Sequence, residues 1–524
     1  MGQLSFIDRA VCVAYLGVVF GLAIWSMRGQ RDNEDFFVGG RRMNWWAVGV
    51  SMFATSFSSI SFLGLPQRGA YQDFSFYLTI LLIPLVITPL LWFFFVPLYV
   101  RLRVSSGYEY LRLRFSPTVQ RIGSLLYCGY ALGWMGAMLY AIALTLRGVL
   151  DLSSTQYLWT LIGLGVFATA YTAVGGLRAV IWTDVLQSVT LGAAVVIVLL
   201  LAVGRIAGGF SGLWEVGAEH GRFTMFHLDS NLLAAENFTA GNSVYTAIAF
   251  SFFMYLPGYA VAQNMIQRYV CSGGLREGRG IVVLSGLINA GLGFLFLLVG
   301  VALFAFYTQA GGPGLPTLQS EDQILPHFVS TQAARVGLVG LMLAGLFAAA
   351  MSTIDSGING VASVIVYDWL GGKQLPLRAS RSLTVALGVL VIVAALVAPR
   401  LGDNVLDIIN AIAGPLLGGL MAIFLLGMFT PRANTQGALI GLAAGAASLM
   451  LVATTTDFPK WWYGAFAIGP TWIVGILASY LFAPPPDESL AATVWTRATA
   501  KRPLPVAVTA ETEEKNERSS NSSS

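Results

Sequence analysis

The stretch AAAMSTIDSGIN, residues 348–359, places an acid among hydroxyl and amide side chains inside a long apolar run. Four of its polar residues recur at i, i+3, i+4 and i+7, namely Ser352, Asp355, Ser356 and Asn359. On a helix these positions share one face. Hydrogen bonding between membrane helices would account for the serines, but it does not require a charged group. Hydroxyl and carboxylate oxygens are the ligands that small hard cations favour, so the pattern favours a cation site.

A second hydroxyl-rich stretch, SMFATSFSSISFLGLP, covers residues 51–66. Its hydroxyls lie in the middle of an apolar run and are followed by Gly64 and Pro66. Hydroxyl groups can satisfy the backbone groups that a break in a membrane helix frees, and such breaks are tolerated where they line a cavity. Transporters use them to present carbonyls to Na⁺. The stretch therefore predicts a broken helix, and Pro257 with Gly258 predicts a second break five spans later.

Asp184, in AVIWTDVLQSV, is the second acid inside an apolar run. A carboxylate at such depth costs several kcal/mol unless it is paired, hydrated or bound to a cation. Asp184 lies about six residues and Asp355 about eleven residues from the inner ends of their expected spans, so both fall in the cytoplasmic half. These depths are compatible with one shared site.

The composition identifies lipid as the solvent for these stretches. Of 524 residues, 56% are hydrophobic and 11% are charged, whereas soluble domains carry about 25% charged residues. A membrane-spanning helix needs roughly 20 mostly apolar residues. The sequence therefore predicts an all-α polytopic membrane protein with about thirteen spans, at 8–27, 44–65, 77–100, 122–146, 156–174, 178–203, 241–262, 281–307, 335–366, 382–399, 405–430, 437–455 and 462–483.

The charges of the loops predict the orientation. With the N-terminus outside, 17 Lys and Arg residues fall in the inner loops and 8 in the outer loops, in agreement with the positive-inside rule. We expect a multi-pass protein of the inner or plasma membrane of the cell, with its N-terminus outside and its C-terminus cytoplasmic. Residues 1–483 form the expected transmembrane transporter domain. Residues 484–524 are polar and poor in aromatic residues, which predicts a disordered cytoplasmic tail.

Several classes of function are disfavoured by the sequence. The basic residues are spread over short loops, which gives no reason to propose a nucleic-acid partner. The three cysteines are scattered and the three histidines lie outside the expected spans, so we expect neither a Cys/His metal site nor a catalytic constellation. No Walker motif that would couple transport to ATP is present. A carrier is favoured over an enzyme, and a transporter-like solute sensor stays an alternative.

Six motifs, in the same order, resemble the sodium/solute symporter family over nearly all of residues 8–483. They are ATSFSSISFLGLP (54–66), SSGYEYLRLRF (105–115), YTAVGGLRAVIWTDVLQ (171–187), QNMIQRYV (263–270), AAAMSTIDSGIN (348–359) and AGPLLGGLMAIFLLGMFTPRAN (413–434). The overall pattern is similar to bacterial sialic acid transporters and to the iodide, monocarboxylate and multivitamin branch of that family.

The resemblance implies the five-plus-five inverted-repeat core of amino-acid-transporter-like proteins, with repeats over 44–203 and 241–430. Helices 8–27, 437–455 and 462–483 would then be peripheral. It also implies a protein that functions as a monomer in the lipid bilayer. That monomer would carry a small organic solute, of the carboxylate, sugar or sugar-derivative class, into the cell by Na⁺-coupled symport and alternating access. Proton-coupled or mixed-ion symport on the same fold is the alternative.

One or two Na⁺ would be the coupling ions. By resemblance, the ligands of the first Na⁺ are the main-chain carbonyls of Ala54, Phe57 and Ala349 and the hydroxyls of Ser352 and Thr353. This set agrees with the independent interpretation of both hydroxyl clusters.

The sialic acid branch has a further Na⁺ site, whose positions here are Asp184, Ser352, Asp355 and Ser356. Asp355 departs from the family pattern, which has a hydroxyl at this position. Two carboxylates close together raise the proton affinity of one of them unless a cation intervenes. We therefore expect a second Na⁺ or a proton here. The alternative is that Asp355 pairs with a nearby donor and serves packing alone.

The resemblance places the solute against three serines, two aromatic rings and an amide, namely Ser56, Ser58, Ser61, Phe76, Trp134 and Gln263. At Trp134 the sialic acid branch has an arginine that fits the carboxylate of its substrate, and a Trp cannot replace that bidentate charge. A pocket without a fixed cation is therefore expected. It suits a small carboxylate held by hydroxyls and a helix N-terminus, or a neutral sugar or polyol stacked on Trp134.

Overall fold

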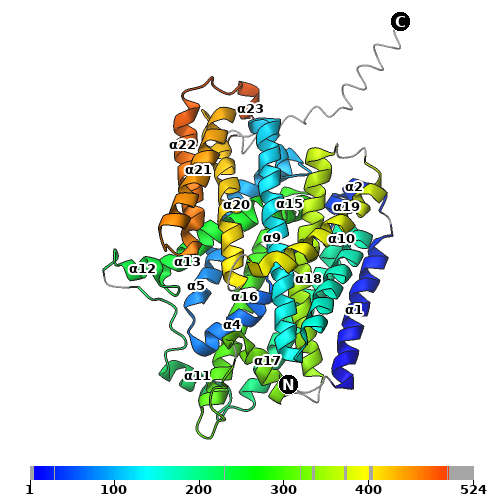
Figure 1. Cartoon of the computed structure of the whole chain (residues 1–524), viewed down its shortest axis with the longest axis vertical. Helices are drawn as coiled ribbons and strands as arrows, with labels where there is room; N and C mark the ends of the chain where they lie inside the picture. The colour runs from blue at the N-terminus through cyan, green and yellow to red at the C-terminus, as the bar shows by residue number, and fades with distance from the viewer. Residues whose placement is uncertain are drawn as a thin grey trace.

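The computed structural model describes residues 5–28, 30–228, 231–318, 320–332, 337–370, 375–400, 405–491 and 494. Over these residues the regular structure is helical, without a strand. Figure 1 shows one bundle, with most of the helices close to the long axis of the molecule. Of the expected tail, the described part includes the short helix α23 (Asp487–Ala491), and the rest lies outside the described residues.

The apolar runs form long helices. The uninterrupted ones are α1 (Phe6–Ser26), α9 (Pro117–Leu150), α16 (Leu275–Thr308), α18 (Leu338–Val364), α19 (Leu377–Val397), α20 (Val405–Phe429), α21 (Thr435–Thr455) and α22 (Tyr463–Ser479). Two further runs are divided by π-helical turns, into α5 (Ser75–Leu82), α6 (Thr88–Leu90) and α7 (Val96–Leu102), and into α13 (Val244–Phe250) and α14 (Leu256–Val261). The remaining short helices are α2 (Asn33–Val38), α8 (Glu109–Arg114), α11 (Phe210–Glu219), α12 (Ala235–Thr239) and α17 (Ile324–Gln332).

The described residues contain 11 helices that are long and apolar enough to cross a membrane, or 12 if a bent pair counts as one span. The difference from thirteen arises at α10 (Ser154–Val203), whose 50 residues include two of the expected spans. A straight helix of that length would extend about 75 Å, more than twice the thickness of a bilayer core. The chain turns at Gly176, where φ is +55° and ψ is −161°. The number thirteen stays a prediction.

The predicted break in the second span is confirmed. Helix α3 (Trp45–Ser56) and helix α4 (Ser59–Tyr71) meet at an angle of 68°. Between them Phe57 is extended, with φ −98° and ψ +107°. The hydroxyl cluster therefore straddles the interruption, as its composition indicated.

The second interruption lies at a different residue from the one expected. Pro257 is the second residue of α14, and a π-helical turn leads directly into that helix, so the chain stays helical through the proline. The chain instead leaves the helical conformation at Ala262, with φ −78° and ψ +130°, before α15 (Gln263–Val270) begins. The proline is accommodated by the local change of helix type, and the break follows five residues later.

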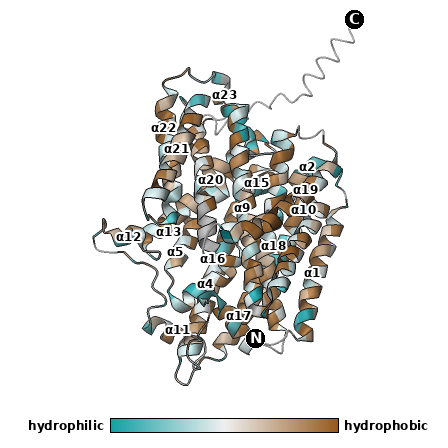
Figure 2. Cartoon of the chain, in the orientation of Figure 1, coloured by the Kyte–Doolittle hydropathy of each residue, from teal (hydrophilic) through white to brown (hydrophobic). Residues whose placement is uncertain are grey.

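Helix α18 lies in the interior of the bundle. It packs against α10, α9, α1 and α3, and every residue from Ala348 to Val364 is buried. By contrast, Figure 2 shows apolar residues along most of α1, at the outside of the bundle. The polar face of the AAAMSTIDSGIN stretch therefore faces other helices and not lipid.

Candidate ion and solute site

The first polar site lies where α18 meets the end of α3. The Ser352 hydroxyl donates to the Ala54 carbonyl oxygen at 2.9 Å, which joins the two helices. Ser352 and Thr353 also lie 3.3 and 3.4 Å from the Ala349 carbonyl oxygen. The last carbonyls of a helix have no intrahelical partner, so the break at Phe57 leaves acceptors free. The structure thus brings four of the five expected ligand residues into hydrogen-bond contact and places the fifth at the break.

A cavity of about 410 Å³ lies next to this point, within the usual range for small-molecule sites. Five residues expected at the solute site line it, namely Ser56, Ser58, Ser61, Phe76 and Trp134. Thr353 lines it as well. One residue therefore belongs both to the expected ion site and to the wall of the cavity.

Gln263 is not brought to the wall of this cavity. Its side chain is fully buried. The amide oxygen accepts a hydrogen bond from the Gly107 backbone at 2.8 Å, and the amide nitrogen donates to the Ser105 carbonyl at 2.9 Å. The resemblance placed Gln263 against the solute, whereas in the structure it holds the loop before α8.

Arg68 is a wall residue that lies between the expected spans 44–65 and 77–100. It is in the last turns of α4, is half-buried, and lines the cavity. Its guanidinium carbon lies 4.4 Å from the centre of the Phe76 ring. The cavity therefore contains a fixed cation, contrary to our expectation from the sequence.

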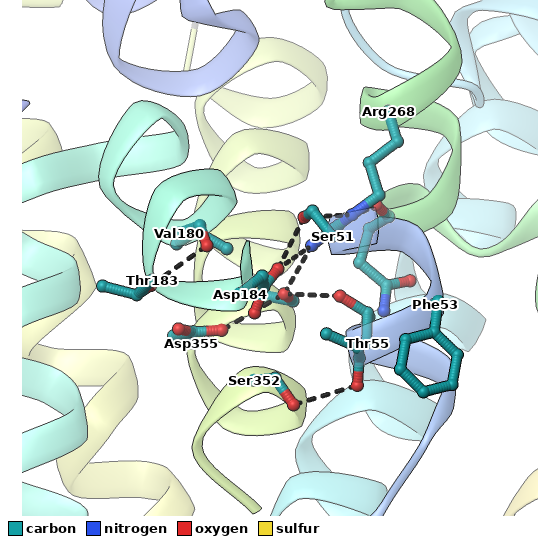
Figure 3. A network of polar contacts seen from close by, with 12 residues as sticks. Ser51, Phe53, Thr55, Val180, Thr183, Asp184, Arg268, Ser352 and Asp355 are labelled. Atoms are coloured by element: carbon teal, nitrogen blue, oxygen red, sulfur yellow. Dashed lines mark hydrogen bonds and ion pairs between the residues drawn. The ribbon is translucent and has the colours of Figure 1, made fainter. Parts of the chain in front are cut away.

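The second polar site is organised by Arg268, which lies between the expected spans 241–262 and 281–307. The residue is in α15 and is fully buried. Its Nη2 lies 2.9 Å from Asp184 Oδ2 and 2.8 Å from Ser356 Oγ, and its Nε lies 3.0 Å from Ser51 Oγ. Ser51 in turn donates to Asp184 Oδ2 at 2.5 Å. Figure 3 shows Arg268, Ser51 and Asp184 converging, with Asp355 beside Asp184.

Asp355 has donors of its own. Its Oδ2 accepts a hydrogen bond from the Tyr171 hydroxyl at 2.6 Å, and its Oδ1 accepts one from Ser356 at 3.2 Å. Ser356 also contacts the Thr55 hydroxyl at 2.9 Å. The hydroxyl of Ser356 thus joins the second polar site to the broken helix, next to the residues expected to bind the first Na⁺.

The charges of the second site do not balance. Asp184, Asp355 and Arg268 are each fully buried, and when ionised they carry two negative charges and one positive charge. Among the described residues, Asp184 Oδ1 has no hydrogen-bond partner. An uncompensated buried charge is costly, and a free carboxylate oxygen is where a further cation would bind.

The spacing within QNMIQRYV could have pointed to Arg268. Asn264 and Arg268 are four residues apart, so they share one helix face, and Arg268 Nη1 donates to the Asn264 carbonyl at 2.6 Å. No local pattern, however, indicates that this face meets Asp184, which precedes it by 84 residues.

Comparisons with known proteins agree with this geometry. Residues 36–445 match the profile of the Sodium:solute symporter family. The chain belongs to the sodium:solute symporter family. A sodium/sialic acid symporter from Aliivibrio fischeri is 30% identical to it over 92% of this chain and 94% of the relative. The human sodium/iodide cotransporter is 33% identical over 86% of this chain and 70% of the relative.

A solved structure supports the same conclusion at the level of the fold. It is the substrate-bound, outward-open state of a Na⁺-coupled sialic acid symporter, described as revealing a novel Na⁺ site. Its TM-score is 0.82 at 26% identity, with 92% of this chain and 99% of that chain covered. As a member of the sodium:solute symporter family, the protein is a membrane-spanning transporter that performs Na⁺-coupled symport of a solute.

Proposed function

We propose that one coupling Na⁺ is held by the carbonyls of Ala54, Phe57 and Ala349 and by the hydroxyls of Ser352 and Thr353. The contact of 2.9 Å between Ser352 Oγ and the Ala54 oxygen carries the proposal, because it places a hydroxyl of α18 against the free end of α3. Five oxygens of neutral groups suit a small hard cation. The ion replaces hydrogen bonds that these oxygens otherwise make with each other.

Coupling follows from the position of this site beside the cavity. Na⁺ draws α18 and the end of α3 together, which fixes the break. The hydroxyls of Ser56 at the end of α3 and of Ser58 and Ser61 at the start of α4 are fixed with it. The solute then binds to a surface that the ion has organised. Na⁺ and the solute both stabilise the same arrangement of the break, so each one raises the affinity for the other.

The cavity supports a small organic solute of the carboxylate, sugar or sugar-derivative class. The three serines offer hydroxyl groups, and the rings of Phe76 and Trp134 offer flat apolar surfaces. The relatives are a sodium/sialic acid symporter, a sodium/iodide cotransporter and a sodium-coupled monocarboxylate transporter. These names cover different solutes, so it is the wall of this cavity that selects among them.

At the second site we propose a further monovalent cation, Na⁺ or H⁺, bound by Asp184, Asp355 and Ser356. Arg268 balances one of the two carboxylates, and the net charge of −1 supports one added cation. The unpartnered Asp184 Oδ1 is the oxygen that would receive it. If H⁺ and not Na⁺ binds there, transport is proton-coupled or mixed-ion symport.

We further infer the arrangement in the membrane. The loop charges support an N-terminus outside and a cytoplasmic C-terminus, in a multi-pass protein that functions as a monomer in the bilayer. Repeats over 44–203 and 241–430 of opposite orientation would each begin with an interrupted helix, at Phe57 and at Ala262. Solute and Na⁺ then enter the cell by alternating access.

A thermal-shift screen of the purified full-length protein tests the proposal. A ligand that binds only the native state raises the melting temperature. We expect the solute to raise it in NaCl and not in choline chloride. Shifts that are the same in both salts would refute Na⁺ coupling. Counterflow in proteoliposomes then separates a carrier from a transporter-like sensor, because a sensor gives no solute flux.

A further inference from the structure

Arg68 is the only charged residue among the described residues that line the cavity. The other wall residues are apolar, hydroxyl-bearing, amide-bearing or aromatic. A guanidinium in a wall of this composition creates a positive potential in the space where the solute binds.

The guanidinium is held in place by its surroundings. Helix α4 packs closely on α16 at Gly69. The approach is so close that a Cβ at this residue would overlap the Leu297 carbonyl oxygen. The guanidinium lies over the Phe76 ring at 4.4 Å, and its Nη1 donates to Gln72 Oε1 at 3.2 Å. Stacking and one hydrogen bond fix the plane of the guanidinium. Its N–H groups form a planar fork, which suits bidentate recognition of a carboxylate.

The described part of the chain gives this guanidinium no carboxylate partner within ion-pair distance. Two acids on neighbouring segments are engaged elsewhere. Asp73 accepts from the Ser75 backbone at 2.8 Å and lies 2.6 Å from His227 Nε2. Glu321 accepts from Gln67 Nε2 at 2.6 Å. A bound anion would therefore supply the missing countercharge.

We propose that Arg68 binds the carboxylate of an organic acid and that the transported solute is a small carboxylate, not a neutral sugar. This inference rests on the proposed function of the cavity. A volume of about 410 Å³ exceeds what a monatomic anion needs, so the remaining space accommodates an organic body against Trp134 and the serines of α4. Arg68 thus decides the charge of the solute, and the rest of the wall decides its shape.

Pairs of acids and their amides test the inference. The probes are benzoate and benzamide, nicotinate and nicotinamide, and propanoate and propanamide, each added to the full-length protein in NaCl and in choline chloride. We expect an acid to raise the melting temperature in NaCl and its amide to have no effect. Arg68→Gln should weaken the binding of that acid roughly 10- to 100-fold. Arg68→Lys should weaken it less, because it keeps the charge but loses the fork.

Arg222→Gln is the matched control. Arg222 contacts the same segment, since its Nη1 donates to the Gln72 carbonyl, and it stacks on Phe304 at 3.9 Å. It does not line the cavity, so the affinity for the acid should not change. An equal loss in Arg222→Gln and Arg68→Gln would show a general effect of charge and would overturn the assignment.

Binding of radioactive Na⁺ separates failure of this inference from failure of the proposed function. Arg68→Gln should bind Na⁺ as the unmodified protein does, which also shows that it folds. If an amide gave the Na⁺-dependent shift, or if Arg68→Gln bound the acid unchanged, the carboxylate anchor would be wrong while Na⁺ symport stood. If no shift depended on Na⁺, the proposed function would fail with it.

Discussion

Arg268 Nη2 lies 2.9 Å from Asp184 Oδ2, and neither side chain is exposed. The pair joins α15, which follows the second interruption, to the second half of α10. Ser51 of α3 and Ser356 of α18 complete the arrangement through the same guanidinium. Four helices, which also carry the residues of the two proposed ion sites, therefore meet at one buried charge pair.

Removing one partner of this pair should destabilise the protein strongly. Arg268→Met leaves two buried carboxylates without a countercharge, and we expect the free energy of unfolding to fall by about 3–5 kcal/mol. Asp184→Asn should be costly as well, and the double variant should lose less than the sum of the single variants. Unfolding in detergent measures each value.

The exposed pair of Arg112 and Glu109, 3.2 Å apart, is the control and should contribute only about 0–1 kcal/mol. Equal costs at both pairs would contradict a structural role for Arg268.

Asp355→Asn should remove one coupling cation from the transport cycle. It brings the net charge of the second site to zero, so no further cation is needed there. We expect the cation-to-solute ratio, measured from reversal potentials in proteoliposomes, to fall by one. A site for H⁺ would lose its pH dependence, whereas a site for Na⁺ would show a lower Na⁺ cooperativity.

Tyr171→Phe is the control for this variant, because it removes a hydrogen bond to Asp355 and keeps the carboxylate. The ratio should then be unchanged. If Asp355→Asn itself altered neither stoichiometry nor pH dependence, Asp355 would serve packing alone.

Gly176→Ala should destabilise the turn within α10. The residue has φ +55°, and a Cβ there would lie 2.7 Å from both Cδ2 and the carbonyl oxygen of Phe36. Strain of this kind costs about 1–3 kcal/mol. Gly163→Ala in the same helix is the control, since a Cβ there has nothing within 4 Å and alanine is favoured in helices by about 1 kcal/mol. Melting temperatures should therefore move in opposite directions, and a shift in the same direction would argue against the strained turn.

The sequence predicted those parts of the site that local patterns specify. The hydroxyls of Ser352 and Thr353 stand out in an apolar run, and the serines after Phe57 mark the broken helix. Both signals come from polar residues in apolar runs, where a polar side chain is costly unless it is hydrogen-bonded or functional. They could therefore be recognised without knowing which helix packs against them.

The parts that were missed depend on contacts between distant segments. Arg268 and Arg68 both follow apolar runs and have the charge expected of loop residues, yet α15 is buried and α4 continues past Arg68. Pro257 predicted the wrong position for the second break, because the π-helical turn before it lets the helix continue through the proline. Gln263 was placed by resemblance, and its hydrogen bonds to Ser105 and Gly107 are not encoded in nearby residues.

The central claim is that Na⁺ binds between the end of α3 and Ser352 and Thr353 of α18. Equilibrium binding of radioactive Na⁺ to the purified protein tests it most directly. Thr384→Ala is the control, because the Thr384 hydroxyl is buried and donates to the Ser380 carbonyl within α19. Ser352→Ala loses the contact between its hydroxyl and Na⁺. A contact with a charged group contributes about 1.5–3 kcal/mol, so Na⁺ binding should weaken roughly 10- to 100-fold. Thr384→Ala should bind Na⁺ as the unmodified protein does. Unchanged Na⁺ affinity in both Ser352→Ala and Thr353→Ala would contradict the account.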